Sequence, residues 1–456
     1  MYQWAEKELE SLNLGDRRRE KRLIKIVGDL ASQPGETVPQ ACGDIAATTA
    51  AYDFWKSPYF QPDDIRKAHQ TSTIKRIESQ HIVLAIQDTT NIDLTHHPQT
   101  TGLGYLDSAT TFGLKVHSSL AASVDGVPLG IIYQKVWTRE LENLGIAKKR
   151  RQRETAEKES QRWLDTEPAI QKSISPEKVV VTVADSEADI FDLFHQERAE
   201  NFHLLIRGTH NRKVDHNAKY LHEAIKASPV RGQLQVEVKR SPQQQSRTAE
   251  LTIRYATLDI EVPSHHIRRK LLNPVKLQVI LVREENPPQG VSPISWLLLT
   301  SLEIKSLEDA ARCVRWYTYR WLIERYHYAL KSGCGMEKLQ LETGRRLHMA
   351  LATYSIVAWR LLWLTYEARI HPQTPCDTVL ETHEWQSLCV TISQNPHPPQ
   401  TPPSLVEAVR MIAKLGGFLG RKSDGEPGVK TIWRGLKRLH DIAATWKLLN
   451  HPSEAI

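Results

Sequence analysis

The stretch KVVVTVADSEADIFDLFHQE, residues 178–197, decides the fold class of this chain. It opens on a run of β-branched residues, which favours a buried strand, and then passes into a segment with helical periodicity. HIVLAIQDTT at 81–90 repeats the first half of that pattern, since an apolar run again ends in polar residues. NFHLLIRGTH at 201–210 predicts one more strand. Strands mixed with helices in this way indicate an α/β layered core.

Other strands are expected on both sides of that stretch. The segment 113–137 predicts two strands joined by an Asp125-Gly126 turn, which is a strong hairpin signal. From about 210 to 303, GQLQVEVKR, AELTIRYATLDIEV and VKLQVILVREE alternate with period two between turn-rich segments. We therefore expect a β-rich domain inserted in the α/β core.

The two ends of the chain read as helical. LGDRRREKRLIKIVGDLASQP at 14–34 places an apolar stripe beside a row of cations. The stripe consists of Leu23, Ile24, Ile26, Val27 and Leu30, and the cations are Arg17, Arg18, Arg19, Lys21, Arg22 and Lys25. A basic helix face of this kind can dock on phosphates, and it can equally be a solvated surface.

Three domains and a linker follow from these patterns. We expect an N-terminal helical domain at 1–70 and a core at 71–390 that contains the β-insertion. A linker at 391–403 is rich in proline and should be semi-rigid. A helical region at 404–456 completes the chain.

Composition narrows the classes of function. Among 456 residues, 60 are Lys or Arg and 53 are Asp or Glu, so the net charge of +7 favours an anionic partner such as nucleic acid, although an ordinary basic enzyme has the same balance. The five cysteines are scattered without a Cys-x-x-Cys pair, which argues against a disulfide framework or a zinc ribbon. The most apolar stretch, 349–366, carries Arg360 and is slightly short for a membrane span. We expect it to be a buried helix, with no membrane partner.

Two aspartates stand out because each follows an apolar strand. Asp88 ends the run at 81–90, and Asp185 ends the run at 178–184. Sites in open α/β sheets are usually built at strand ends. Each aspartate alone could instead be a helix N-cap, but two such residues favour a shared carboxylate site.

A third acidic residue lies on a helix predicted over 306–331, which begins with the capping-box pattern Ser306-x-x-Asp309. Four large polar residues at offsets of three, seven and fourteen would fall within roughly a 60° arc of one face of that helix. They are Tyr317, Arg320, Glu324 and Lys331. The alternative interpretation is an exposed i,i+4 ion pair within this set, worth only a few tenths of a kcal/mol.

These residue types suit chemistry on phosphodiesters. Two metal ions can activate a water and stabilise a leaving oxygen, and Mg²⁺ prefers oxygen ligands. Asp88, Asp185 and Glu324 are thus the predicted catalytic carboxylates and metal ligands, with Mg²⁺ as the cofactor and Mn²⁺ as an expected substitute. A lysine and an arginine nearby would hold the substrate phosphates.

The pattern Tyr-x2-Arg-x3-Glu-x6-Lys resembles the helix signature of DDE transposases of the Tn-five type, in the IS-four group of bacterial insertion sequences. IQDTTNID at 86–93 and DSEADI at 185–190 resemble the two aspartate segments of that family. Further similarities extend over nearly the whole chain: NLGDRRREKRL at 13–23, EKESQRW at 157–163, PPQGVSPISWLLLTS at 287–301 and IAKLGGF at 412–418. Few similarities occur at 370–405.

The resemblance implies a cut-and-paste transposase with a ribonuclease H-like core, an N-terminal DNA-binding domain and a C-terminal dimerisation region. Its implied partners are duplex DNA, as transposon-end inverted repeats and as target, and a second copy of the chain, in the bacterial cytosol on the nucleoid. Tyr317, Arg320 and Lys331 match residues that grip phosphates at the transposon end. Further implied DNA contacts are Trp296, which matches a tryptophan that stacks on a flipped base, and Arg207, Arg212, Arg17, Arg18 and Arg22.

Alternatives remain open at this point. Trp296 could be an ordinary core residue, because it precedes LLLT. The chain could be a structure-specific nuclease on the same core, or a domesticated or inhibitory DNA-binding protein. His96-His97 and His265-His266 lack the i,i+4 spacing of a helical metal site and are expected in loops. KKRRQR at 148–153 could bind flanking DNA or be solvated.

Overall fold

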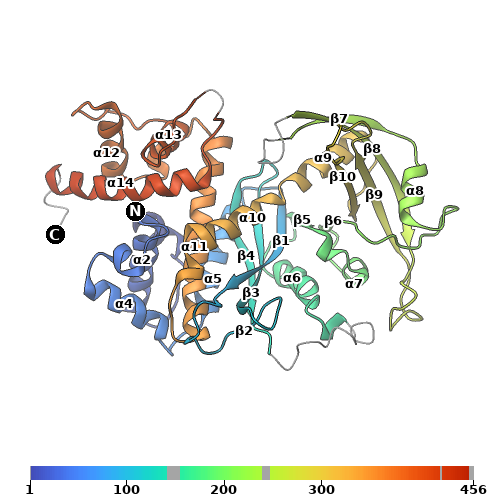
Figure 1. The fold of residues 1–456 in the computed structure, drawn as a ribbon, viewed down its shortest axis with the longest axis horizontal. Coiled ribbons are helices and arrows are strands. Elements are labelled where there is room, and N and C mark those ends of the chain that lie inside the picture. The colour runs from blue at the N-terminus through green and yellow to red at the C-terminus, as the bar shows by residue number, and fades with distance from the viewer. Residues whose placement is uncertain (1, 141–154, 239–246, 422–423, 451–456) are drawn as a thin grey trace. The chain divides into compact units, whose positions relative to one another are not determined.

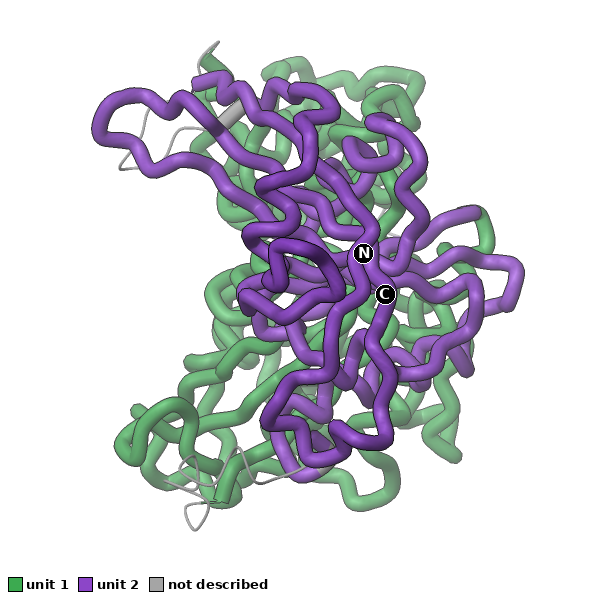
Figure 2. The backbone as a smooth tube through the Cα atoms, turned by 90° about the vertical axis from the view of Figure 1, so that its right-hand side faces the viewer, with its two compact units in different colours: residues 1–79, 89–143, 322–456 green, residues 80–88, 144–321 purple. Residues whose placement is uncertain are grey.

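The structure is a computed structural model that describes residues 2–140, 155–238, 247–421 and 424–450 (Figure 1). Figure 2 shows its two compact units in different colours. Unit 1 comprises residues 1–79, 89–143 and 322–456, and unit 2 comprises residues 80–88 and 144–321. Strand β1 (Ile82–Asp93) contributes residues to both units, and each unit is described by itself.

Unit 2 is built on three parallel strands. Residues 82–88 of β1 pair with β5 (Val179–Ala184), and β5 pairs with β6 (Phe202–Arg207). The α/β class predicted from these three runs is confirmed. Short helical elements follow the strands: η3 (Thr155–Glu157), α6 (Gln161–Gln171), η4 (Ser186–Ala188), α7 (Phe191–His195) and α8 (Leu221–Ala227). Their apolar side chains form one buried core with the strands, because the β-branched runs leave no polar face to expose.

Four antiparallel strands extend the same sheet. In sequence order they are β7 (Gly232–Val238), β8 (Arg247–Ile260), β9 (Val275–Arg283) and β10 (Ser295–Thr300). They pair in the order β10, β9, β8, β7, and β10 joins them to β6. The predicted β-rich segment therefore does form strands. A separate inserted domain is not confirmed, since these strands continue the sheet of unit 2.

The prediction of a single helix over 306–331 is wrong. Its capping box is confirmed, because Ser306 caps α9 (Leu307–Thr318) with Asp309. The helix tightens there, since the N–H groups of Tyr319 and Arg320 donate to carbonyls two or three residues earlier. Five of the six residues in 316–321 are aromatic or β-branched, and such residues are weaker helix formers. The chain resumes as α10 (Trp321–Tyr328) and ends in a π-helical turn, η5 (Ala329–Gly333).

Unit 1 combines helices from both ends of the chain with a small antiparallel sheet. β3 (Phe112–Ala122) and β4 (Pro128–Trp137) form the predicted hairpin, whose Gly126 has a φ of 89° that favours glycine. β2 (Gly104–Tyr105) and β1 also pair with β3. The N-terminal helices are α1 (Tyr2–Glu8), α2 (Arg17–Ser32), α3 (Val38–Cys42), α4 (Ile45–Lys56) and α5 (Pro62–Ile77). The C-terminal elements are η6 (Met336–Lys338), α11 (Gly344–Ile370), η7 (Cys376–Thr378), α12 (Thr382–Ser393), α13 (Leu405–Leu415) and α14 (Val429–Asn450).

Helix α11 is the central helix of unit 1. It is long and apolar enough to cross a membrane by composition, but 83% of its most apolar window is buried inside the protein. It contacts α2, α5, α13 and β4, among other elements. The expectation of a buried helix is confirmed. Its Arg360 donates to the carbonyl of Val379 and stacks on Trp363, which accommodates the one cation in this stretch.

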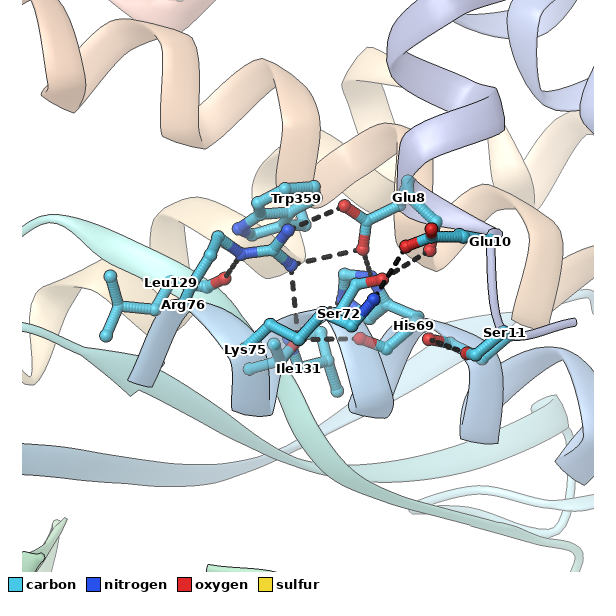
Figure 3. Close-up of polar contacts among 12 residues, drawn as sticks. Glu8, Glu10, Ser11, His69, Ser72, Lys75, Arg76, Leu129, Ile131 and Trp359 are labelled. Carbon is cyan, nitrogen blue, oxygen red and sulfur yellow. Dashed lines mark hydrogen bonds and ion pairs between the residues drawn. The ribbon is translucent and has the colours of Figure 1, made fainter. Parts of the chain in front are cut away.

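A buried polar network ties the N-terminal helices to the rest of unit 1 (Figure 3). Glu8, at the end of α1, is only 4% exposed and accepts bonds from His69 Nδ1 at 2.6 Å and Arg76 Nη1 at 2.7 Å. His69 Nε2 accepts the backbone N–H of Ile131 on β4 at 2.9 Å. The Arg76 guanidinium stacks on Trp359 of α11, 4.1 Å from the ring centroid. One carboxylate thus connects α1, α5, β4 and α11.

The predicted domain boundaries divide the chain into consecutive segments, whereas each compact unit combines segments that are far apart in sequence. Unit 1 takes residues from both ends of the chain, so the expected divisions at 70, 390 and 403 stay predictions. The proline-rich linker lies largely in the connection between α12 and α13, where residues 394–403 form neither helix nor strand. KKRRQR at 148–153 lies outside the described residues.

Candidate active site and nucleic-acid interface

Two predicted carboxylates belong to neighbouring parallel strands of unit 2. Asp185 directly follows β5, as predicted, but Asp88 lies inside β1, which continues to Asp93 and does not end where the sequence predicted. β1 and β5 are parallel, and Ile86 of one pairs with Val183 of the other. Asp88 and Asp185 each lie two residues further along, so the continued register puts them level and on the same face. Asp185 also caps η4, because its Oδ1 accepts the N–H of Glu187 at 2.9 Å. The cap interpretation is therefore confirmed for Asp185, and its position directly after β5 is confirmed as well, whereas the shared carboxylate site stays a prediction.

A second aspartate of DSEADI has a different position. Asp189 is fully buried and accepts the backbone N–H groups of Thr209 at 2.8 Å and His210 at 2.9 Å. It also forms an ion pair with Arg212, whose side chain is 8% exposed. Arg212 therefore fixes the loop after β6, and its predicted DNA contact competes with this ion pair.

Tyr317, at the end of α9, interacts with other predicted residues of unit 2. Its ring lies edge-on to that of Trp296, with centroids 5.7 Å apart. Burial raises the pKa of the Tyr317 hydroxyl, while the cations Arg320 and Arg207 lower it and Asp185 raises it further. These charges act on one hydroxyl, so the structure places Tyr317 close to the strand end that carries Asp185.

The Tyr317 hydroxyl is buried and takes a hydrogen bond from Arg207, an exposed residue at the end of β6. As a donor, this hydroxyl has no acceptor among the described residues. A buried donor without an acceptor costs about 1–3 kcal/mol, and a phosphate oxygen would accept from it.

Trp296 lies near the start of β10 and is only partly buried, whereas the residues from Leu297 to Thr300 are buried. It is not part of the buried core of unit 2. The core alternative is weakened by this exposure, and the base-stacking role stays a prediction.

Two further predicted residues belong to unit 1. Glu324 lies in the first turn of α10 and is partly buried. Lys331, in the π-helical turn, forms an ion pair of 3.1 Å with Glu337, which in turn accepts the N–H of Asp93 at 3.0 Å. In the part of the chain that the structure describes, no three His, Cys, Asp or Glu side chains form a ready metal-binding group. A shared metal site of Glu324 with Asp88 and Asp185 therefore stays a prediction.

The predicted basic face is present on α2. Leu23, Ile26, Val27 and Leu30 are buried, as the apolar stripe required, whereas Ile24 is only partly buried. The cations Arg17, Arg18 and Arg22 are exposed. Arg19 instead stacks on Tyr59, with its guanidinium 4.2 Å from the ring centroid. The two histidine pairs lie in loops, as expected; His97 contacts the carbonyl of Glu337, and His266 contacts Asp192.

The motifs did not reveal a cleft of about 1560 Å³ in unit 2. Ser186 and Glu187, directly after Asp185, form part of its wall, together with the loops at 209–213 and 261–268. The lining comes from segments far apart in sequence, so no local pattern could have identified it. The sole sequence signal is a long stretch without acidic residues, from Val262 to Arg283.

Comparison with known protein families matches three parts of the chain. Residues 1–59 match the family described as Transposase DNA-binding. Residues 158–360 match the Transposase DDE domain, a range that includes Asp185 and Glu324. Residues 356–448 match the Transposase Tn5 dimerisation domain. The three matches lie in this order along the chain and cover helices α1 to α4, most of unit 2 and the C-terminal helices.

Proposed function

Because its three family matches make this chain a DDE transposase of the Tn5 type, we propose that it moves DNA by a cut-and-paste reaction at a site that contains Asp88 and Asp185. The family assignment makes it a metal-dependent enzyme of DNA cleavage and transfer that binds DNA and forms homodimers. A site of action on the bacterial nucleoid is part of the proposal.

One observation supports the site most strongly: β1 and β5 are parallel with Ile86 level with Val183, and Asp88 and Asp185 each follow two residues later. Asp88, Asp185 and Glu324 would hold divalent metal, with Mg²⁺ favoured by the all-oxygen donor set and Mn²⁺ as a substitute. Such ions, when bound, activate a water and stabilise the leaving oxygen of a phosphodiester.

The side chains around Tyr317 would hold the scissile strand. The buried Tyr317 hydroxyl can donate to a phosphate oxygen, which would satisfy its missing hydrogen bond. Arg320 and Arg207 would add charge-assisted bonds to the same or the next phosphate. Lys331 would do so from unit 1 once it exchanges Glu337 for DNA. Arg17, Arg18 and Arg22 on α2 would dock on the backbone of the transposon end, and Arg212 would support this surface by fixing the 209–212 loop.

The proposed reaction begins with hydrolysis at the transposon end, which leaves a 3′-hydroxyl on the transposon and a 5′-phosphate on the flanking DNA. The 3′-oxygen then attacks the opposite strand and displaces its flanking 3′-oxygen, which closes a hairpin. Water reopens the hairpin. The regenerated 3′-hydroxyl finally attacks target DNA and displaces a target 3′-oxygen. Trp296 would stack on a base extruded at the hairpin, beside Tyr317.

The test is cleavage of a labelled end duplex with Mg²⁺. Asp88→Ala, Asp185→Ala and Glu324→Ala should each abolish nicking and leave end binding largely intact, since they remove metal ligands rather than phosphate contacts. Glu303→Ala, at an exposed ion pair with Lys305, is the matched control and should nick normally. Substantial nicking by any of the three variants would remove that residue from the site.

A mixing experiment tests whether one subunit of the dimer binds the DNA end that the other subunit cleaves. A chain with Asp185→Ala is combined with a chain in which Arg17, Arg18 and Arg22 are changed to alanine. If one subunit binds the end that the other cuts, cleavage absent from each variant alone returns in the mixture. No recovery would favour action in cis. A wild-type chain that nicks ends but never joins them to target would instead be a nuclease.

A further inference from the structure

The loop between β8 and β9 has an unusual charge pattern. From Val262 to Pro274 the loop contains no Asp or Glu, but it has three cations. These three are consecutive in the sequence IRRKLL at 267–272. Such a one-sided segment is complementary to a polyanion, and the family signature does not involve it.

The base of this loop is firmly attached to unit 2. Asp192 of α7 accepts bonds from His266 Nε2 at 3.0 Å and from Arg268 Nη2 at 3.4 Å. The His266 ring also packs edge-on against Phe191, at 5.9 Å. Leu272 packs against the buried core of the unit. Internal backbone hydrogen bonds, such as Leu271 N–H to the Arg268 carbonyl at 2.9 Å, set the shape of the turn.

The tip of the loop presents apolar and cationic side chains to solvent. Leu271 is 81% exposed and Ile267 is 51% exposed, although both are large hydrophobic residues. Arg269 and Lys270 are exposed as well, and neither has an ion-pair partner within the described residues. The loop tip thus combines exposed apolar side chains with two cations that form no ion pair within the described residues.

This combination is the chemistry of proteins that bend duplex DNA. Those proteins insert a Leu, Ile, Met or Phe wedge between base pairs from the minor groove, while neighbouring Arg and Lys hold the phosphates. We infer that loop 264–272 is a DNA-bending wedge, with Leu271 and Ile267 at its tip and with Arg269 and Lys270 on the backbone. The inference rests on the proposed function. It gives the transposase a second DNA-binding surface, which does not recognise a particular sequence.

The position of the loop suits duplex DNA beside the cut. His265, Ile267 and Arg268 line the same cleft as Ser186 and Glu187, which directly follow Asp185. DNA bent at the loop would therefore run along the cleft toward the strand ends. Because the wedge and the cations tolerate any sequence, the duplex is one without fixed sequence. It is either the DNA that flanks the transposon or the target.

The first measurement concerns the two cations. In an Asp185→Ala background, which prevents cutting, the affinity for a flanked end duplex is measured from 50 to 200 mM salt. Arg269→Ala with Lys270→Ala should lower the salt slope by about 1.8, so that over this range the parent loses about twelvefold more affinity than the variant. Lys226→Ala on α8, exposed and outside the cleft, is the control. An unchanged slope on both flanked-end and target duplexes would overturn the loop contact.

The second measurement concerns the wedge. A duplex labelled at both ends reports bending by energy transfer, once with flanking DNA and once as free target. Ile267→Ser with Leu271→Ser should lose the bend on one of the two duplexes, which identifies the source, and should keep the salt slope. Val230→Ser, a half-exposed residue of the same unit, should bend DNA like the parent. Unchanged bending on both duplexes would refute the wedge. Failure of the wild-type chain to nick ends would instead refute the proposed function.

Discussion

Two regions of the molecule use carboxylates in opposite ways. In the network of unit 1 shown in Figure 3, Glu8 is buried and takes bonds from His69 and Arg76, so its charge is satisfied by the protein itself. In unit 2, Asp88 of β1 and Asp185, directly after β5, each follow the paired residues Ile86 and Val183 by two positions, and one oxygen of Asp185 accepts a capping hydrogen bond. Two carboxylates close to each other repel, which a divalent cation would relieve. Glu8 is thus a structural carboxylate, whereas Asp88 and Asp185 are the proposed catalytic ones.

The strongest challenge to this contrast is a pair of substitutions within DSEADI. Asp185→Asn should reduce nicking by about three orders of magnitude or more, because a metal ligand is weakened, with little change in thermal stability. Asp189→Asn should instead destabilise the fold by about 3–5 kcal/mol, because it leaves Arg212 buried without a counter-ion. Nicking rates and melting curves of both variants check this. A large loss of stability in Asp185→Asn would erase the distinction.

The network of unit 1 offers the second test. Glu8→Ala should destabilise the protein by about 3–5 kcal/mol, since it leaves the donors of His69 and Arg76 without their acceptor. Glu10→Ala, two residues away in an exposed ion pair with Lys75, is the matched control and should melt like the wild type. Nicking measured well below the melting temperature should survive in both variants. If Glu8→Ala melted normally, the network would not be structural.

Trp296 gives the third, smaller effect. Trp296→Ala should spare the first nick but slow hairpin formation by roughly 10- to 100-fold, since stacking on an extruded base is worth about 1–3 kcal/mol. Trp296→Phe should retain part of the activity. Both steps are followed separately on a labelled end duplex. Equal loss of both steps, with a large drop in melting temperature, would return Trp296 to a purely structural role.

The smallest effect is a dependence on pH. Burial raises the pKa of Glu8, but the bonds and charges of His69 and Arg76 offset this and bring it below its usual value of 4.5. The stability that Glu8 contributes is therefore complete above pH 4.5 and is lost as the pH falls through its lowered folded-state pKa. The difference in melting temperature between wild type and Glu8→Gln should shrink between pH 6 and pH 3. A difference that stayed constant would mean that folding does not lower the pKa of Glu8.

The sequence predicted those parts of the structure that depend on local pattern. The runs before Asp88 and Asp185 became adjacent parallel strands, because β-branched apolar segments can be buried on both faces. The hairpin at Asp125-Gly126 and the capping box at Ser306 depend on a few neighbouring residues, and both were confirmed.

Features that depend on tertiary context were missed. The spacing of the signature residues fits an ideal helix, but the aromatic run at 316–321 interrupts it. Pattern alone could not show that β10 pairs with β6, which joins the strands of the β-rich segment to one sheet; the inserted domain is not confirmed. The ion pair of Arg212 was missed because its partner, Asp189, lies 23 residues away in sequence. The DNA contact of Arg212 stays a prediction. The exposure of Leu271 likewise depends on how the ends of its loop are anchored.

Because each unit is built from segments far apart in sequence, neither unit can fold completely until late in the synthesis of the nascent chain. Residues 82–88 leave the ribosome nearly a hundred residues before β5, their partner strand, and unit 2 is complete only after residue 321. The N-terminal helices wait longer still, because Trp359 of α11 covers Arg76 of α5. Chains fold as their parts are synthesised, at about 5–20 residues per second. The N-terminal helices would thus spend roughly 15–60 seconds without α11, a window in which chaperones or early DNA contacts could act on them.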